Sequence, residues 1–204
     1  MRAIVTGASK GIGKALVELL LNRGSKVCAC ARSAVLEREN LLFIKSDISI
    51  PDRAKEFVNA CGDYLGRFDL VVNNAAILGQ ISRIENYDPL LWKEVIDINL
   101  NGSFYIVRFS LKYMDRGSII VNVSSGVGRR VAPGWGAYSI SKFAIEAFTA
   151  LLDAELKERG IRAIAFNPGG VATDMRAIAY PDEDRSLLKT PEQAARELLE
   201  LIGF

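Results

Sequence analysis

Short apolar runs alternate with amphipathic stretches along the whole chain. The runs at 69–72 and 118–123 are largely apolar without a polar alternation, which is typical of strands that are covered on both faces, as in a parallel sheet. The pattern predicts strands at 2–6, 25–31, 41–45, 68–73, 117–124 and 161–166. It predicts helices at 11–23, 51–66, 89–114, 137–160 and 191–202, and a short helical turn at 33–39.

Two of these helices begin with a capping residue followed by proline. Asp88-Pro89 and Thr190-Pro191 are favourable helix starts, because the side chain accepts a free N–H and proline fits the first turn. Repeated strand–helix units imply right-handed crossovers, so the sequence predicts a doubly wound α/β fold with a parallel sheet. Ligands bind such sheets beyond the carboxyl ends of the strands. We therefore expect the site residues directly after strands.

Composition and charge fit a single domain spanning 1–204. Of the 204 residues 50% are hydrophobic, and the net charge of +2 is too small to suggest a nucleic-acid partner. The chain has no histidine, which excludes imidazole catalysis and argues against a zinc site, so no metal is expected. Cys28, Cys30 and Cys61 are expected to be reduced thiols.

The start of the chain has no targeting pattern. Met1-Arg2 is followed at once by the apolar residues of the first strand and then by glycines, and no apolar run approaches the length that spans a bilayer. We therefore expect a soluble, cytoplasmic protein without a membrane partner.

A glycine-rich turn joins the first strand to the first helix. Gly7, Gly11 and Gly13 let the backbone turn tightly and approach a pyrophosphate, and the helix N-terminus adds free N–H groups. Glycine also serves ordinary turns, and the spacing matches neither G-x-G-x-x-G nor the Walker pattern. The strand before and the helix after the turn favour nucleotide binding. The expected contacts are Gly7, Ser9, Lys10, Gly11, Ile12 and Gly13.

The end of the second strand indicates which cofactor is bound. An acidic residue there would hold a ribose 2′-hydroxyl, but the chain has Ala31 followed by Arg32, with Lys10 in the glycine turn. Cations suit a 2′-phosphate, so the sequence predicts NADP(H) in preference to NAD(H). The alternative is two solvated cations at loop ends.

Asp47 and Ile48 follow the third strand. Asp47-Ile48 could meet the adenine edge of a nucleotide. Asp47 could equally be the N-cap of the helix that begins near Pro51. Both interpretations stay open on the sequence alone.

Tyr138 and Lys142 lie four residues apart in a predicted helix, so both can face one pocket. A nearby cation favours the phenolate and is expected to lower the pKa of the tyrosine towards the range where it exchanges protons near neutral pH. The alternative is a surface tyrosine beside a solvated lysine.

Together the glycine turn and the Tyr138–Lys142 pair resemble the short-chain dehydrogenase/reductase family, in its soluble single-domain branch. The resemblance runs from residue 1 to about 202. After strand four the chain has Asn73-Asn74-Ala75-Ala76, where the family usually ends in glycine, so Ala76 is a departure. The resemblance implies a Rossmann fold with strand order 3-2-1-4-5-6.

The resemblance also implies roles for particular residues. Tyr138 would be the general acid or base, Lys142 would lower its pKa and hold the ribose, and Asn99 would hold a water that supplies protons. Ser125 would bind the substrate oxygen, with Ser124 as the less favoured alternative. The segment 167–173 would close over the nicotinamide. The further implied cofactor contacts are Asn74, Ala75, Tyr138, Lys142, Pro168, Gly169, Val171 and Thr173.

The implied function is an NADP(H)-dependent oxidoreductase that reduces a carbonyl to an alcohol, or the reverse. The alternative is a non-catalytic NADP(H)-binding sensor or partner subunit with the same fold. Trp135 and Leu78 are placed where they could line the substrate pocket, although packing explains them equally well.

The sequence stops one element earlier than is usual in the family. Only Gly203-Phe204 follow the last predicted helix, so we expect six strands without the family's last one. Since that strand helps to build a tetramer, its loss favours a homodimer through helices 89–114 and 137–160. The segment 174–190, which should cover the substrate, is short and predicts an open pocket.

Overall fold

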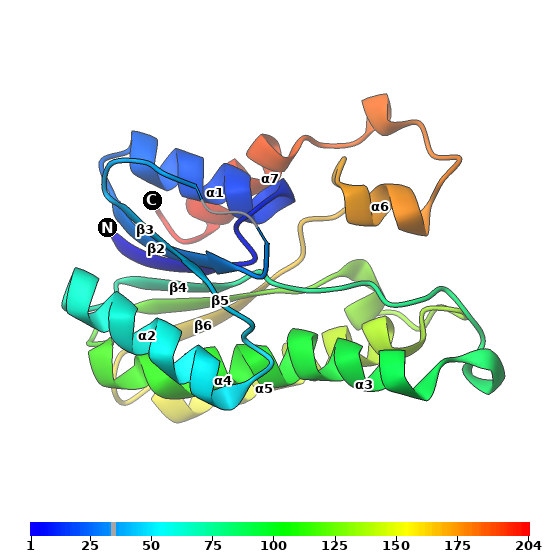
Figure 1. Cartoon of the computed structure of the whole chain (residues 1–204), viewed down its shortest axis with the longest axis horizontal. Coiled ribbons are helices and arrows are strands. Elements are labelled where there is room, and N and C mark those ends of the chain that lie inside the picture. The colour runs from blue at the N-terminus through cyan, green and yellow to red at the C-terminus, as the bar shows by residue number, and fades with distance from the viewer. Residues whose placement is uncertain (34–35) are drawn as a thin grey trace.

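Six parallel strands form one sheet in the order β3-β2-β1-β4-β5-β6 (Figure 1). The computed structural model of the chain describes residues 1–33 and 36–204. The strands are β1 (Arg2–Thr6), β2 (Lys26–Ala31), β3 (Leu41–Lys45), β4 (Leu70–Asn73), β5 (Ile119–Val123) and β6 (Arg162–Phe166). Both the doubly wound α/β fold and its strand order are therefore confirmed, and each strand lies within its predicted range.

Helices cover both faces of the sheet, and a small helix lies beyond the carboxyl ends of the strands (Figure 1). α1 and α7 pack on one face, where their apolar residues share a core with β1, β2, β4 and β5, and α2, α4 and α5 pack on the other. The small helix is α6. The helices are α1 (Gly11–Asn22), α2 (Pro51–Leu65), α3 (Pro89–Ile96), α4 (Gly102–Ser110), α5 (Gly136–Leu156), α6 (Asp174–Ala179) and α7 (Pro191–Leu201).

Two of the predicted helix starts are confirmed in detail. Asp88 accepts hydrogen bonds from the backbone N–H groups of Leu90 and Leu91 at the start of α3. Thr190 and Gln193 form a capping box at the start of α7. These side chains satisfy N–H groups that a helix leaves free at its first turn.

The single helix predicted over 89–114 is wrong, because the chain divides there. α3 ends at Ile96, a π-helical turn occupies Asp97–Asn101, α4 follows, and a 3₁₀ turn covers Leu111–Tyr113. A π turn inserts one residue into the helical ladder and rotates the residues around it. The turn places Asn99 inside the protein. The predicted helical turn at 33–39 includes residues 34–35, which lie outside the described residues, and 36–38 have no helical structure.

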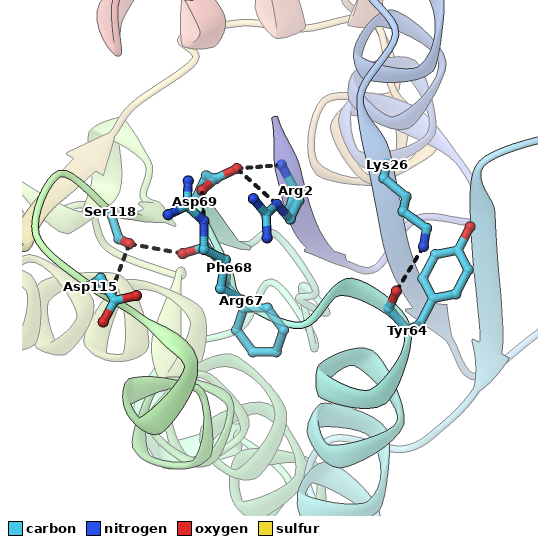
Figure 2. A network of polar contacts seen from close by, with 8 residues as sticks. All are labelled: Arg2, Lys26, Tyr64, Arg67, Phe68, Asp69, Asp115 and Ser118. Atoms are coloured by element: carbon cyan, nitrogen blue, oxygen red, sulfur yellow. Dashed lines mark hydrogen bonds and ion pairs between the residues drawn. The ribbon is translucent and has the colours of Figure 1, made fainter.

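Polar contacts join the amino ends of the strands, at the edge opposite the glycine turn (Figure 2). Asp69 accepts a hydrogen bond of 2.8 Å from the backbone N–H of Arg2, and the hydroxyl of Ser118 donates to the carbonyl of Phe68 at 2.8 Å. Lys26 donates to the carbonyl of Tyr64 at 2.8 Å. The first two bonds connect the starts of β1, β4 and β5, and the third joins β2 to the end of α2, so this edge of the sheet is used for structural contacts.

Candidate active site

The glycine turn after β1 is held in place by side chains from the ends of β1 and β4. The Thr6 hydroxyl accepts hydrogen bonds from the backbone N–H groups of Asn74 and Ala75, each at 3.1 Å. The Asn74 amide donates to the carbonyls of Thr6 and Gly7 at 2.9 and 3.0 Å. The turn is therefore rigid before any ligand binds.

Two glycines are required by close packing in this turn. Gly7 has φ +66°, and a Cβ there would lie 2.6 Å from the Cα of Ala75. A Cβ on Gly13 would lie 2.4 Å from both the Asn74 side-chain nitrogen and the Gly7 carbonyl oxygen. Only glycine lets the backbone of β1, β4 and α1 approach this closely.

The start of α1 suits a pyrophosphate. Among the described residues no side chain caps this helix, since its N-cap Lys10 makes no side-chain hydrogen bond to it, and its first turn carries no acidic residue. The first N–H groups of α1 are thus free, and the helix dipole adds positive potential there. The residues present fit a dinucleotide cofactor at this end of the sheet.

One continuous cavity of about 680 Å³ runs along the carboxyl ends of the strands. Two of the predicted site residues, Gly13 and Asn99, do not line it. Gly13 acts through packing, as described above. The predicted residues that do line the cavity are Gly7, Ser9, Lys10, Gly11, Ile12, Ala31, Arg32, Asp47, Ile48, Asn74, Ala75, Ser125, Tyr138, Lys142, Pro168, Gly169, Val171 and Thr173.

The two cations expected to meet a 2′-phosphate both reach the cavity, and each is paired with a carboxylate. Lys10 Nζ lies 3.0 Å from Asp174 Oδ2, and Arg32 Nη1 lies 3.1 Å from Glu94 Oε1. Between 49% and 73% of each of the four side chains is exposed to solvent. These ion pairs are therefore weak and exchange readily. The cations therefore remain free to change partner when an anion binds.

Asp47 lines the cavity and does not cap α2. Its Oδ1 accepts hydrogen bonds from the backbone N–H and the hydroxyl of Ser49, at 3.0 and 2.7 Å. The N-cap of α2 is Ile50 instead. The capping interpretation is therefore wrong, because Asp47 lies before the N-cap position and its carboxylate is used in a local turn with Ser49.

Tyr138 and Lys142 lie together in the cavity wall, at the start of α5. The Lys142 Nζ is 5.6 Å from the centre of the Tyr138 ring and donates a hydrogen bond of 2.7 Å to the carbonyl of Val123. Burial lowers the pKa of Lys142 from 10.5 to about 8. Both side chains face one pocket, so the surface interpretation is wrong.

The expected lowering of the Tyr138 pKa by Lys142 is not found. Burial raises the pKa of Tyr138, and only the nearby Ser125 hydroxyl acts in the opposite direction. Desolvation disfavours the phenolate, whereas the ammonium is directed at a backbone carbonyl. The tyrosine is therefore a protonated phenol at neutral pH.

The alternative serine, Ser124, has a buried hydroxyl with no hydrogen-bond partner among the described residues.

Asn99 is a buried connector between three segments. Its side-chain oxygen accepts from the backbone N–H of Ile77 at 2.8 Å, and its amide donates to the Ile77 carbonyl and to the Ser141 hydroxyl, each at 3.0 Å. Both amide hydrogens are thus used within the protein. Asn99 holds the loop after β4 against the first turns of α5, where Tyr138 and Lys142 lie.

Comparison with known proteins agrees with this geometry. The family model described as short chain dehydrogenase matches residues 1–184. The chain belongs to the short-chain dehydrogenase family. A protein of Escherichia coli K12, described as the uncharacterized oxidoreductase YciK, is 31% identical over 98% of this chain and 85% of its own length. The chain is an oxidoreductase of this family, as its motifs predicted.

Two solved structures of short-chain dehydrogenases are similar to the whole fold. One, from Escherichia coli CFT073 in complex with NADPH, has a TM-score of 0.87 at 31% identity and covers 98% of this chain and 89% of its own. Another, from Shigella flexneri 2a strain 301 in complex with NADP, has a TM-score of 0.86 at 29% identity, with coverage of 98% and 88%. Both proteins bind the phosphorylated cofactor.

Segment 174–190 of this short-chain dehydrogenase, called the lid below, contains residues that line the cavity and that the sequence prediction missed. Segment 174–190 begins with α6, which Thr173 caps by accepting from the backbone N–H of Arg176 at 3.2 Å. A threonine followed by aspartate is a helix-start signal that could have revealed α6. The missed lid residues that line the cavity are Asp174, Met175, Arg176, Ile178 and Ala179.

Trp135 and Leu78 both line the cavity, so their predicted position is confirmed. Leu78 is buried, and Trp135 is half-buried directly before α5.

Across 1–33 and 36–204, none of the helices is long and apolar enough to cross a membrane.

Proposed function

We propose that residues 1–204 form one NADP(H)-binding domain that reduces a carbonyl compound to an alcohol, or catalyses the reverse. The observation that carries the proposal is the meeting of Ser125, Tyr138 and Lys142 in the wall of one cavity that continues to the glycine turn. A cofactor-binding protein without turnover has no need for a buried phenol and a buried amine at the same wall. The proposed location is cytoplasmic.

The proposed chemistry follows from the states of these side chains. A bound nicotinamide cofactor supplies the hydride. The raised pKa of Tyr138 keeps its phenol protonated, which suits donation of a proton to a substrate oxygen that gains negative charge. The Ser125 hydroxyl, beside Tyr138, donates a hydrogen bond to the same oxygen. Lys142, with a pKa of about 8, can return a proton to the phenolate.

The experiment that tests this function measures NADPH oxidation with a panel of aldehydes, ketones and quinones. We expect turnover with at least one carbonyl compound, and none above background in the Tyr138→Phe variant. Saturable NADPH binding without any turnover difference between the two proteins would instead support the sensor or partner-subunit function.

We propose that NADP(H) is preferred over NAD(H), because Lys10 and Arg32 reach the cavity and the last residue of β2, Ala31, carries no carboxylate. Arg32→Gln is expected to lower kcat/KM for NADPH by about 10- to 100-fold, the effect of losing one charge-assisted hydrogen bond. The value for NADH should change little. Initial rates with both cofactors measure the ratio.

Glu94→Gln is the control for this prediction. It removes the carboxylate that pairs with Arg32 at 3.1 Å, so it should raise kcat/KM for NADPH and leave that for NADH almost unchanged. An equal loss with both cofactors in Arg32→Gln would show that Arg32 does not recognise the 2′-phosphate.

We propose a homodimer through α4 and α5. Exposed aromatic and aliphatic side chains gather on these helices, and Phe104 of α4 packs edge-on against Phe148 of α5 at a centroid distance of 6.3 Å. Large exposed apolar patches usually mark contact surfaces. The exposed members are Phe104 (46%), Ile140 (51%), Phe143 (36%) and Leu151 (55%).

Phe104→Glu is expected to convert the dimer to a monomer, because a carboxylate would be buried without a partner in the interface. Sedimentation velocity measures the change. Leu201→Glu is the matched control, since Leu201 is 49% exposed but lies on α7, on the other face of the sheet. A wild-type protein that sediments as a monomer at micromolar concentration would refute the interface.

A further inference from the structure

An indole ring forms part of the cavity wall beside the predicted proton donor. Trp135 lies directly before α5, and the centre of its ring is 5.8 Å from the centre of the Tyr138 ring, at an angle of 44°. The ring lines the cavity. A substrate whose carbonyl oxygen meets the Tyr138 hydroxyl must therefore place the adjoining part of its skeleton near this indole.

The backbone around Trp135 is fixed before any substrate binds. Gly134 and Gly136 have φ of +88° and +42°, and a Cβ on Gly136 would lie 2.2 Å from the Tyr87 ring. The Gly134 carbonyl accepts a hydrogen bond of 2.8 Å from the backbone N–H of Ser82. The indole is thus presented by a rigid turn, which lowers the entropy lost when a ligand packs on it.

The lid also contacts the indole. The Tyr180 ring lies 5.7 Å from the Trp135 ring, and the Arg176 guanidinium lies 3.8 Å from the centre of the Tyr180 ring. Arg176 in turn makes two hydrogen bonds of 2.6 Å to the carboxylate of Glu183. Aromatic rings at these distances attract one another, and the cation is favourably placed on a ring face.

The charge of Arg176 is neutralised by this pairing. The Arg176 guanidinium lowers the pKa of Glu183, so the carboxylate stays ionised beside it. Lys142, which also lines the cavity, is directed at the Val123 carbonyl. Apolar residues from the loop after β4 and from the lid also line the cavity. These apolar residues are Ile77, Leu78, Met175, Ile178 and Ala179.

We propose that this site selects neutral, flat carbonyl compounds in which the carbonyl is conjugated to an aromatic ring, and disfavours saturated and carboxylate-bearing analogues. This inference rests on the proposed carbonyl reduction. The flat ring packs on the Trp135 indole, which Tyr180 and the Arg176–Glu183 pair hold in place. Because Glu183 already neutralises Arg176, a substrate carboxylate gains little from this cation to offset its loss of water.

The first test compares benzaldehyde with cyclohexanecarbaldehyde, which has the same ring size without the flat π system. Trp135→Leu is expected to lower the ratio of their kcat/KM values by about 2- to 10-fold, the usual contribution of an aromatic pair. Comparing the ratio between proteins cancels the different intrinsic reactivities of the two aldehydes. Trp135→Phe should restore most of the ratio, and 4-carboxybenzaldehyde should be a poorer substrate than benzaldehyde.

The second test does not depend on turnover. The chain has two tryptophans, so Trp92→Phe leaves Trp135 as the sole indole reporter. Acetophenone is expected to quench its fluorescence saturably, and cyclohexyl methyl ketone is not. Trp92→Phe should also leave the aldehyde ratio unchanged, because Trp92 packs against Tyr87 outside the cavity.

The outcomes separate this inference from the proposed function. Reduction of both aldehydes with a ratio that Trp135→Leu does not change would overturn the inference and leave the function standing. A preference for 4-carboxybenzaldehyde would also overturn it. Saturable quenching by acetophenone without reduction of any carbonyl would refute the proposed function and retain the aromatic binding site. Absence of both quenching and turnover would refute both.

Discussion

Replacing Tyr138 with phenylalanine is expected to lower kcat by about 1,000-fold, while the affinity for NADPH changes little. The variant removes the hydroxyl that we propose as the proton donor to the substrate oxygen, and proton transfer by a positioned side chain usually contributes about 10²- to 10⁴-fold. The ring itself stays, so its packing against Trp135 at 5.8 Å is retained. Single-turnover kinetics with saturating NADPH measure the chemical step directly.

Two further variants test whether the loss is specific. Tyr105→Phe, on α4, is the matched control and should keep wild-type kcat, because Tyr105 does not line the cavity. Ser125→Ala should lose less than Tyr138→Phe, and the double variant should be no worse than Tyr138→Phe alone if both groups act on the same oxygen. Retention of a tenth or more of kcat in Tyr138→Phe would exclude it as the proton donor.

Replacing Lys142 with methionine is expected to abolish most turnover and yet to stabilise the fold at pH 7. The lysine is 4% exposed, and its Nζ makes one hydrogen bond, to the Val123 carbonyl. The difference between 10.5 and the buried pKa of about 8 corresponds to roughly 3 kcal/mol of unfavourable burial of the charge. The lost hydrogen bond offsets part of this, so a gain of about 1–2 kcal/mol is expected.

The stabilisation should depend on pH in a defined direction. Below about pH 8 both the folded and the unfolded lysine carry the proton, so the cost of the buried charge is fully present. Between about 8 and 10.5 the folded protein releases the proton first. The unfolded chain then binds more protons, and the stability of the wild type rises with pH. The advantage of Lys142→Met should therefore shrink across this window.

Urea unfolding of both proteins at several pH values measures this difference, since groups that titrate alike in both cancel. Lys55→Met, at an exposed position on α2, is the matched control and should change the free energy of unfolding by less than about 0.5 kcal/mol. A Lys142→Met variant that is less stable than the wild type at pH 7, by an amount that does not vary with pH, would contradict the buried-charge account.

Local patterns were sufficient for most of the fold. Continuous apolar runs and their spacing predicted all six strands, and capping residues such as Asp88 and Thr190 predicted two helix starts. These signals act over a few residues and need no knowledge of the partner segments. The π turn at Asp97–Asn101 was missed, because its cause is a long-range contact: Asn99 turns inward to bind Ile77 and Ser141.

The candidate site, like the fold, was predicted from the sequence only in part. By itself the sequence determined which residue types follow which strands, and thus the glycine turn, the cations Lys10 and Arg32, and the Tyr138–Lys142 pair. Only the tertiary structure decided that Lys10 pairs with Asp174 across 164 positions of the chain and that Trp135 meets the lid at Tyr180. It also reversed the expected pKa shift of Tyr138. The spacing of residues along the chain predicts which side chains share a face of a helix. The pKa of a side chain depends instead on its burial, and burial is set by segments that are distant in sequence.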